Sequence, residues 1–299
     1  RHLSALGEVL PPPREGGQTV GGRPLVNLSL AVNYALGGTA VRGYHVFNFI
    51  VHVLGALLLF GIGRRTLLMP VLRDRFGAAA TPLAVAIALL WAVHPLLTES
   101  VTYVIQRAES LMGLFYLLTL YCFIRGNDCH LLNDKDRSIH HVEKEDCHLI
   151  DDKRLMARGG FWRMLAWLAC LCGMATKEVM VSAPLMVMLY DRTFVAGSWR
   201  GAWGKRKFFY ASLGSTWLLL GWLVLGAQNR GGTAGLGLGD SVWTYALTQT
   251  RAIVIYLRLA WWPRPLVFDY GTDAITHFAD GVRFALVILA MFASTAVGF

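Results

Sequence analysis

Mostly apolar stretches separated by short polar segments recur along the whole chain, and most of them are long enough to cross a bilayer. A bilayer core about 30 Å thick is spanned by roughly 20 residues of helix. Lipid offers the backbone no hydrogen-bond partners, so such stretches must be helical. The pattern predicts an all-α, polytopic transmembrane helix bundle with about seven spans, at residues 44–62, 79–95, 109–125, 161–176, 179–191, 208–227 and 283–299.

Two further stretches predict interfacial helices. Residues 246–262 carry Arg251 and Arg258 seven positions apart, on one helical face, and end at Trp261-Trp262-Pro263. Tryptophan prefers the headgroup level of a bilayer, so this stretch is interpreted as an interfacial or half-inserted helix. Residues 23–38 gather leucine, alanine and valine on one helical face, which predicts a helix lying on the membrane surface.

The composition agrees with a membrane protein. The chain has 299 residues, a mean hydropathy of +0.46, and 16% charged residues, against about 25% in soluble domains. This deficit of charge argues against a disordered chain, an ordinary soluble enzyme or a nucleic-acid-binding module. The net charge of +9 could suggest nucleic acid, but the basic residues fall between the apolar runs, so no nucleic acid is expected as a partner.

The distribution of lysine and arginine predicts which ends of the spans face the cytoplasm. The segments 64–75, 125–163 and 192–207 hold seventeen of these residues, whereas the alternate segments 94–107, 177–178 and 228–245 hold three. Basic residues accumulate in cytoplasmic loops. The second set of segments therefore faces the periplasm, or the lumen in a cell with an endoplasmic reticulum.

The same pattern divides the chain into regions. Residues 1–42 are expected to form an outer-face loop and surface helix, and residues 43–299 a transmembrane helix bundle. Residues 126–158 interrupt the bundle with a charged, cytoplasmic insertion, interpreted mainly as a solvated loop. Zinc binding by its Cys-His and His-His pairs is the alternative, although their spacing matches no established zinc motif. These pairs are Cys129-His130, His140-His141 and Cys147-His148.

Ionisable residues gather at the outer ends of the spans, where they are usually paired or functional. His94-Pro95 ends one span, and a continuous helix is expected to follow through Glu109. On that helix Glu99 and Arg107 share a face. One interpretation is a polar wall that holds a phosphate through Arg107. The other is an Arg–Glu pair that holds two spans together, and the sequence alone favours it slightly.

Two other polar groups can likewise be interpreted as functional or as structural. Lys177-Glu178 lies in the break between two apolar runs, where the lysine could bind an anionic lipid phosphate or extend to the membrane surface. His45, Asn48 and His52 give one face of the first span a polar character. Such a face must contact protein or a wet cavity, and helix–helix hydrogen bonding is the expected role of His52.

Five motifs, in this order, resemble one family: RPLVNLSLAVNYALGG, GYHVFNFIVH, HPLLTESVTYVIQRAESLMGLFYLLTLY, GMATKEVMVSAPLMVMLYDRTF and YLRLAWWPRPLVFDYG. They resemble the membrane half of the transmembrane-and-TPR-repeat proteins, GT-C type glycosyltransferases that include O-mannosyltransferases. The resemblance covers nearly the whole chain outside 126–158. It implies a GT-C-like bundle that transfers a sugar from a polyprenyl-phosphate donor to a protein or glycan acceptor at the outer face.

The resemblance also implies roles for individual residues. The catalytic acidic residue sits in an Asp-Asp motif that is expected upstream of Arg1, and the role is not transferred to Glu8. A preceding span and C-terminal TPR repeats are expected outside this chain. No cofactor is firmly implied, and a divalent metal remains open. The residues expected to bind the donor phosphate are Arg107, Lys177, Glu99, Glu109, Glu178, His94, Arg23, Asn33 and Arg258.

Two rival functions were weighed against the transferase. A non-catalytic membrane scaffold of the same fold would act in assembly or export through a TPR tail. A secondary transporter would place charges at mid-membrane, whereas these charges gather at one edge. The partners expected are membrane lipid, a lipid-linked sugar and an acceptor. The bacterial inner membrane is expected in preference to the endoplasmic reticulum.

Overall fold

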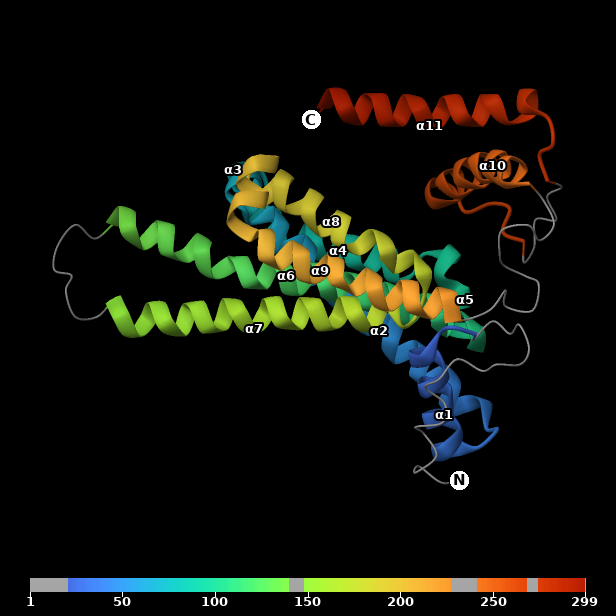
Figure 1. The fold of residues 1–299 in the computed structure, drawn as a ribbon, viewed down its shortest axis with the longest axis horizontal. Coiled ribbons are helices and arrows are strands. Elements are labelled where there is room, and N and C mark those ends of the chain that lie inside the picture. Colours follow the sequence, from blue (N-terminus) through green and yellow to red (C-terminus); the bar gives the residue numbers. More distant parts are fainter. Residues whose placement is uncertain (1–20, 140–147, 227–240, 268–273, 299) are drawn as a thin grey trace. The chain divides into compact units, whose positions relative to one another are not determined.

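The structure is a computed structural model that describes residues 21–139, 148–226, 241–267 and 274–298, without the side chains of 128–139 and 148–158. All regular secondary structure in these residues is helical, which confirms the predicted all-α class. The chain divides into two units, of which the first ends at Gln228 and the second comprises mainly Asn229–Phe299. Figure 1 shows the helices of both units.

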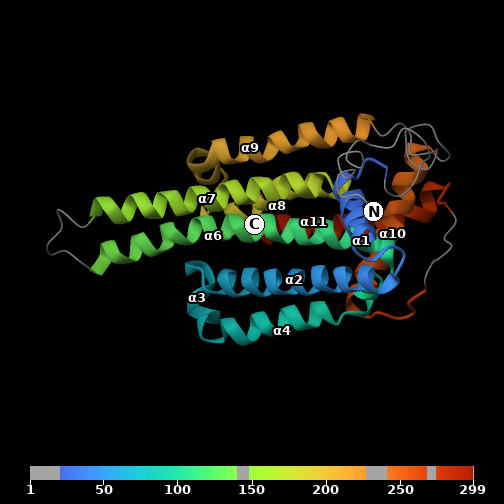
Figure 2. The same cartoon turned by 90° about the horizontal axis from the view of Figure 1, so that it is seen from below.

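The first unit is a bundle of long helices with shorter ones between them. Figure 2 shows α2 and α4 lying side by side, with α6 and α7 forming a second antiparallel pair. Aromatic and aliphatic side chains of α6, α7, α8 and α9 form its core, including Phe123, which stacks on Phe209. The helices are α1 (Pro24–Gly37), α2 (Val41–Leu67), α3 (Pro70–Phe76), α4 (Ala80–Ala92), α5 (Thr98–Thr102), α6 (Arg107–Ile139), α7 (His148–Met174), α8 (Ala183–Tyr190) and α9 (Trp199–Gly226).

Helices long and apolar enough to cross a membrane support a multi-pass membrane protein. Among the described residues five segments satisfy both conditions: Val41–Leu67, Pro70–Ala92, Val104–Asn127, Trp199–Gly226 and Phe278–Val297. Each overlaps a predicted span. Large apolar side chains such as Phe208, Leu218 and Leu225 point outward and are more than three-quarters exposed. Lipid explains such exposure, because water would penalise it.

The other two predicted spans have a different form. Residues 161–174 of the stretch 161–176 lie within α7, which also contains the charged residues that precede them. The stretch 179–191 is a 3-10 turn over Glu178–Ser182 followed by the short α8. Eight residues of helix rise only about 12 Å, so α8 alone is too short to cross a bilayer.

The prediction of a solvated loop over 126–158 is wrong for most of that segment. α6 continues to Ile139 and α7 begins at His148, and the resulting hairpin extends beyond α2 and α9 (Figures 1 and 2). At its base a Cβ on Gly159 would lie 3.3 Å from the Gly126 carbonyl, so two glycines allow the helices to approach closely. The side chains proposed as zinc ligands lie outside the described residues.

The predicted continuous helix from 94 to 109 is also wrong. Tyr103 is extended, with φ −109° and ψ 116°, and separates α5 from the turn that precedes α6. The His45 ring is 3.2 Å from the Val101 carbonyl, and Asn48 donates to the Tyr103 carbonyl at 3.4 Å. Because side chains of α2 satisfy these carbonyls, the backbone can leave the helix here.

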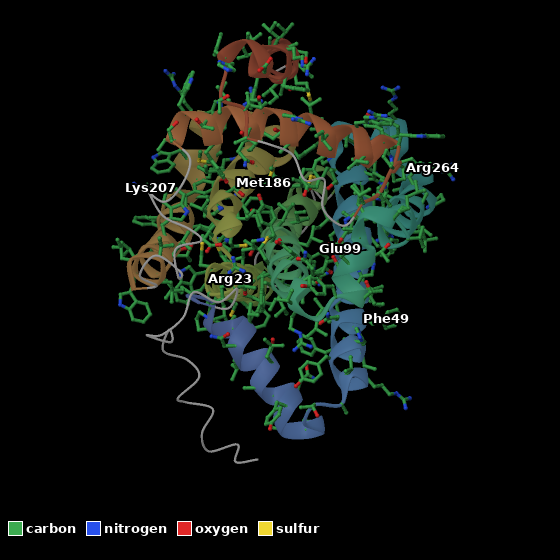
Figure 3. The ribbon with its side chains drawn as sticks, turned by 90° about the vertical axis from the view of Figure 1, so that its right-hand side faces the viewer. Arg23, Phe49, Glu99, Met186, Lys207 and Arg264 are labelled. Carbon is green, nitrogen blue, oxygen red and sulfur yellow. The ribbon has the colours of Figure 1, made fainter. Side chains whose placement is uncertain are left out.

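The second unit consists of α10 (Val242–Trp261) and α11 (Phe278–Gly298). The two helices cross steeply, as Figures 1 and 3 show from perpendicular directions. Trp243 stacks on Phe278 with ring centroids 6.3 Å apart, and Leu247 packs where Gly281 leaves room for it. α10 is not among the five candidate spans, so its interfacial position remains a prediction.

Candidate functional site

Arg107, at the first position of α6, is fully buried and joins three helices. Its Nε donates to Asn48 Oδ1 at 2.9 Å, its Nη1 to the Ser29 carbonyl at 3.1 Å and its Nη2 to the Tyr44 carbonyl at 3.1 Å. The guanidinium carbon lies 4.2 Å from the centre of the Phe47 ring. A buried cation is tolerated only with such compensation. Arg107 therefore ties α1 and α2 to α6.

These contacts bear on the two interpretations of Arg107. Its donors point at protein oxygens, so in this conformation the side chain holds helices together. The expected Glu99 partner is absent from its contacts, because the break at Tyr103 takes Glu99 to a different face. Glu99 instead accepts a hydrogen bond from Gln106 Nε2 at 3.3 Å.

A second group of charges lies at the same end of α6, and we name it the rim cluster: Arg23, Glu109, Lys177 and Glu178. Lys177 forms an ion pair with Glu109. Arg23 Nη2 lies 3.4 Å from Glu178 Oε2. The Leu25 amide donates to the Ala175 carbonyl at 3.2 Å, which holds the start of α1 against the end of α7. Motifs far apart in sequence thus meet in one place.

The break after α7 positions two members of this cluster. The helix ends at Met174, and Lys177 is extended, with φ −159° and ψ 149°. The 3-10 turn then begins at Glu178. A Cβ on Gly173 would lie 2.6 Å from Met180 Sδ, so glycine permits this tight return of the chain. The neighbouring residues Lys177 and Glu178 consequently reach Glu109 on α6 and Arg23 before α1.

The rim cluster is electrically balanced and partly open to solvent. The side chains of Lys177 and Glu109 are 20% and 39% exposed. Ion pairs of this kind contribute only about 0–1 kcal/mol, because water screens both charges. Replacement of Glu109 by an incoming anion as the partner of Lys177 would therefore cost little free energy. The buried Arg107 could not exchange its partners so easily, because its hydrogen bonds hold helices together.

The structure does not bring every predicted residue to this cluster. The His94 Nδ1 accepts from the Leu96 amide at 3.3 Å and caps the turn after α4. Asn33 donates to the Gly43 carbonyl at 3.2 Å. Glu99 lies in the first turn of α5, away from Arg23, which precedes α1 (Figure 3). Arg258 lies on α10 in the second unit.

Hydrogen bonding between helices accounts for the polar face of α2, as expected for His52. His52 Nε2 lies 2.8 Å from the Ala92 carbonyl, and its ring stacks on Trp91 with centroids 4.9 Å apart.

No group of three or more potential metal ligands occurs among the described residues. The question of a divalent metal therefore stays open.

A buried polar group that contacts the second half of α6, at Asn127, was missed in the sequence. Asp191 is fully buried and pairs with Arg206, whose Nη1 lies 2.9 Å from Asp191 Oδ1. The Tyr210 hydroxyl donates to the same carboxylate, and Arg206 Nε donates to Asn127 Oδ1 at 2.9 Å. Arg206 was counted only as a loop cation. A lone aspartate directly after an apolar run was the signal that could have identified this group.

Comparison with known proteins identifies relatives of the chain. It is 28% identical over 266 residues to the Drosophila melanogaster protein O-mannosyl-transferase Tmtc2, and 28% identical over 275 residues to Tmtc1 of the same organism. Each alignment covers 85% of this chain. Human protein O-mannosyl-transferase TMTC4 is 38% identical over 116 residues, 33% of the chain. No family model matches the chain, and no solved structure matches it significantly.

The chain is thus similar over most of its length to proteins named protein O-mannosyl-transferase. This similarity confirms the resemblance to the transmembrane-and-TPR-repeat proteins. Together with the five apolar helices, it supports an integral, multi-pass membrane protein. The chain spans about a quarter of these relatives' length, 24% of Tmtc2 and 28% of Tmtc1. The relatives named here are animal proteins, so the expectation of a bacterial inner membrane has no support from them.

Proposed function

We propose that this chain is part of a membrane O-mannosyltransferase that transfers mannose from a polyprenyl-phosphate donor to a hydroxyl group of a protein. The observation that carries the proposal is the similarity over 85% of the chain to two proteins named protein O-mannosyl-transferase. The rim cluster faces the lumen of the endoplasmic reticulum in this proposal, because the basic loops lie at the other ends of the spans.

The rim cluster suits the donor side of such a reaction. A polyprenyl phosphate carries an anionic head at the membrane surface and an apolar tail in lipid. Departure of the phosphate is favoured by a nearby cation, and activation of the acceptor hydroxyl needs a base. Lys177 is the more exposed of the two cations in the rim cluster, and the donor phosphate would compete with Glu109 for its ammonium group. Arg107 holds α6 in position. No described carboxylate is assigned as the base.

A transfer assay tests this proposal on the full-length protein in membranes. The donor is radiolabelled polyprenyl-phosphate mannose and the acceptor is a serine- and threonine-rich peptide. Lys177→Ala should raise the KM for the donor about tenfold or more, because a charge-assisted contact to phosphate is lost. The matched control is Lys205→Ala, an exposed lysine at the other end of the bundle. Loss of activity in both variants, or in neither, would contradict the assignment.

A scaffold of the same fold is the second candidate. Its support is that the three cations described above contact protein: Arg107 contacts α1 and α2, and Arg23 and Lys177 each contact a carboxylate. A scaffold needs only these structural contacts. Absence of mannose transfer by well-folded wild-type protein, with any donor chain length, would favour the scaffold and reject the transferase.

A further inference from the structure

An open pocket of about 250 Å³ lies between α10 and α11, within the second unit. Arg251 of α10 lines one part of it, and Arg283 and Phe284 of α11 line another. The short segment Ala274–Thr276 and the first turn of α11, with Asp280, complete the lining. The pocket therefore contains two cations and one carboxylate. It belongs to no residue set assigned above to mannose transfer.

Neither guanidinium in this pocket has a carboxylate partner among the described residues: no described carboxylate lies within 4.0 Å of Arg251 or Arg283. The Arg283 guanidinium lies over the ring of Phe284, at 4.8 Å from the ring centre. Arg251 is half-buried. By contrast, Arg107 and Arg206 in the first unit each contact several oxygens. Two uncompensated arginines that line one pocket attract an anion.

The walls of the pocket are held in place by contacts between the helices and the intervening segment. The Ile275 amide donates to Thr248 Oγ1 at 2.9 Å, and Thr248 precedes Arg251 by one turn. Ile275 is buried against Leu247, and Trp243 stacks on Phe278. These contacts fix the segment 274–276 beside Arg251. A preformed site loses less entropy when a ligand binds.

The residues around the pocket favour a position at the level of a membrane surface. α11 is a candidate span that begins at Phe278, so Arg283 occupies its second turn. Trp243 and Trp261, at the two ends of α10, are exposed, as tryptophans of an interfacial belt are. Arginine near the end of a span meets lipid headgroups rather than lipid tails.

We propose that Arg251 and Arg283 bind a single phosphate group, which a phospholipid or another alkyl phosphate presents at the membrane surface. Arginine suits this role because its planar guanidinium group donates two parallel hydrogen bonds to phosphate oxygens. The volume is below the roughly 300–1,000 Å³ of pockets that enclose a drug-sized ligand. It therefore accommodates a charged headgroup and leaves the chains outside. This site does not depend on mannose transfer.

The test is a binding titration on the purified full-length protein in a neutral maltoside detergent. Three ligands are compared: dioctanoyl phosphatidic acid, dioctanoyl phosphatidylcholine and inorganic phosphate. Phosphatidic acid should bind at least tenfold more tightly than phosphatidylcholine, whose choline neutralises the phosphate. Competition by inorganic phosphate at equal concentration would make free phosphate the ligand, and its failure to compete would make it a lipid headgroup. Either result supports the phosphate site.

Variants separate this site from general attraction to a basic protein. Arg251→Ala and Arg283→Ala should each weaken phosphatidic acid binding about tenfold. Arg264→Ala, an exposed arginine of the same unit outside the pocket, removes the same charge and should change binding less than twofold (Figure 3). Asp280→Asn should tighten binding several-fold, which a misfolded protein could not do. Equal loss in the Arg264 and Arg251 variants, or unchanged binding in the double variant, would overturn the proposal.

Discussion

Arg107 and Asn48 lie 59 positions apart in the sequence and share a buried hydrogen bond of 2.9 Å. The same Asn48 side chain donates to the Tyr103 carbonyl at 3.4 Å, where the backbone leaves the helix before α6. One amide thus satisfies a buried cation through its oxygen and a broken helix through its nitrogen. Because Asn48 satisfies the Tyr103 carbonyl, the backbone before α6 can be non-helical although it lies inside a membrane protein.

Replacement of Arg107 should therefore affect stability first. Arg107→Ala leaves the Ser29 and Tyr44 carbonyls and the Asn48 amide oxygen without their buried donor. We expect a loss of several kcal/mol, because each buried acceptor left without a donor costs about 1–3 kcal/mol. The melting temperature in detergent, followed by size-exclusion chromatography, measures it. Arg42→Ala, exposed at the start of α2, is the control. An Arg107→Ala protein of normal stability that fails to bind donor would instead restore the phosphate-binding interpretation.

Glu109 should limit the availability of Lys177. Glu109→Gln removes the carboxylate paired with Lys177 and should lower the KM for the polyprenyl-phosphate donor a few-fold, with stability changed by less than about 1 kcal/mol. Steady-state transfer kinetics measure the effect. Glu99→Gln, at a carboxylate that Gln106 contacts, is the matched control and should leave this KM unchanged. A higher KM in the Glu109 variant would mean that the carboxylate itself assists donor binding.

The buried pair Asp191–Arg206 should respond to paired substitution. Asp191→Leu alone leaves the Arg206 cation unpaired and should destabilise the protein by about 3–5 kcal/mol. The double variant Asp191→Leu with Arg206→Met should recover a large part of this loss, because no buried charge remains unpaired. Thermal unfolding of the three proteins in the same detergent gives the coupling. Additive losses in the double variant would show that the two residues act independently.

The class of fold could be predicted from the sequence because one physical requirement dominates it, the helical structure that lipid imposes on long apolar runs. Apolar runs of membrane length force helices, and all five candidate spans coincide with predicted ones. Local breaks were predicted less well. Tyr103 leaves the helix because side chains from α2 satisfy the exposed carbonyls, and no local pattern near residue 103 contains that information. The insertion was assigned to a loop from its charge, yet charged residues are compatible with a helix that extends into water.

The candidate site was predicted as a set of residues, but its pairing was not. Lys177, Glu178 and Glu109 were predicted from their positions at span ends, and Arg23 from the family resemblance. The partner of each depends on the return of the chain at Gly173 and on how α1 docks against α7, which are tertiary features. The Asp191–Arg206 pair was missed because its arginine resembled an ordinary loop cation. Burial, which the sequence does not give directly, distinguishes the two.

The side of the membrane that the rim cluster faces is central to this account. Single cysteines at positions 99 and 205, introduced into the full-length protein with its native cysteines replaced, can be labelled in sealed, right-side-out microsomes with a membrane-impermeant maleimide. The account predicts that position 205 reacts at once and that position 99 reacts only after detergent opens the vesicles. Immediate reaction at position 99 with protection of position 205 would contradict the lumenal assignment and the proposed donor site with it.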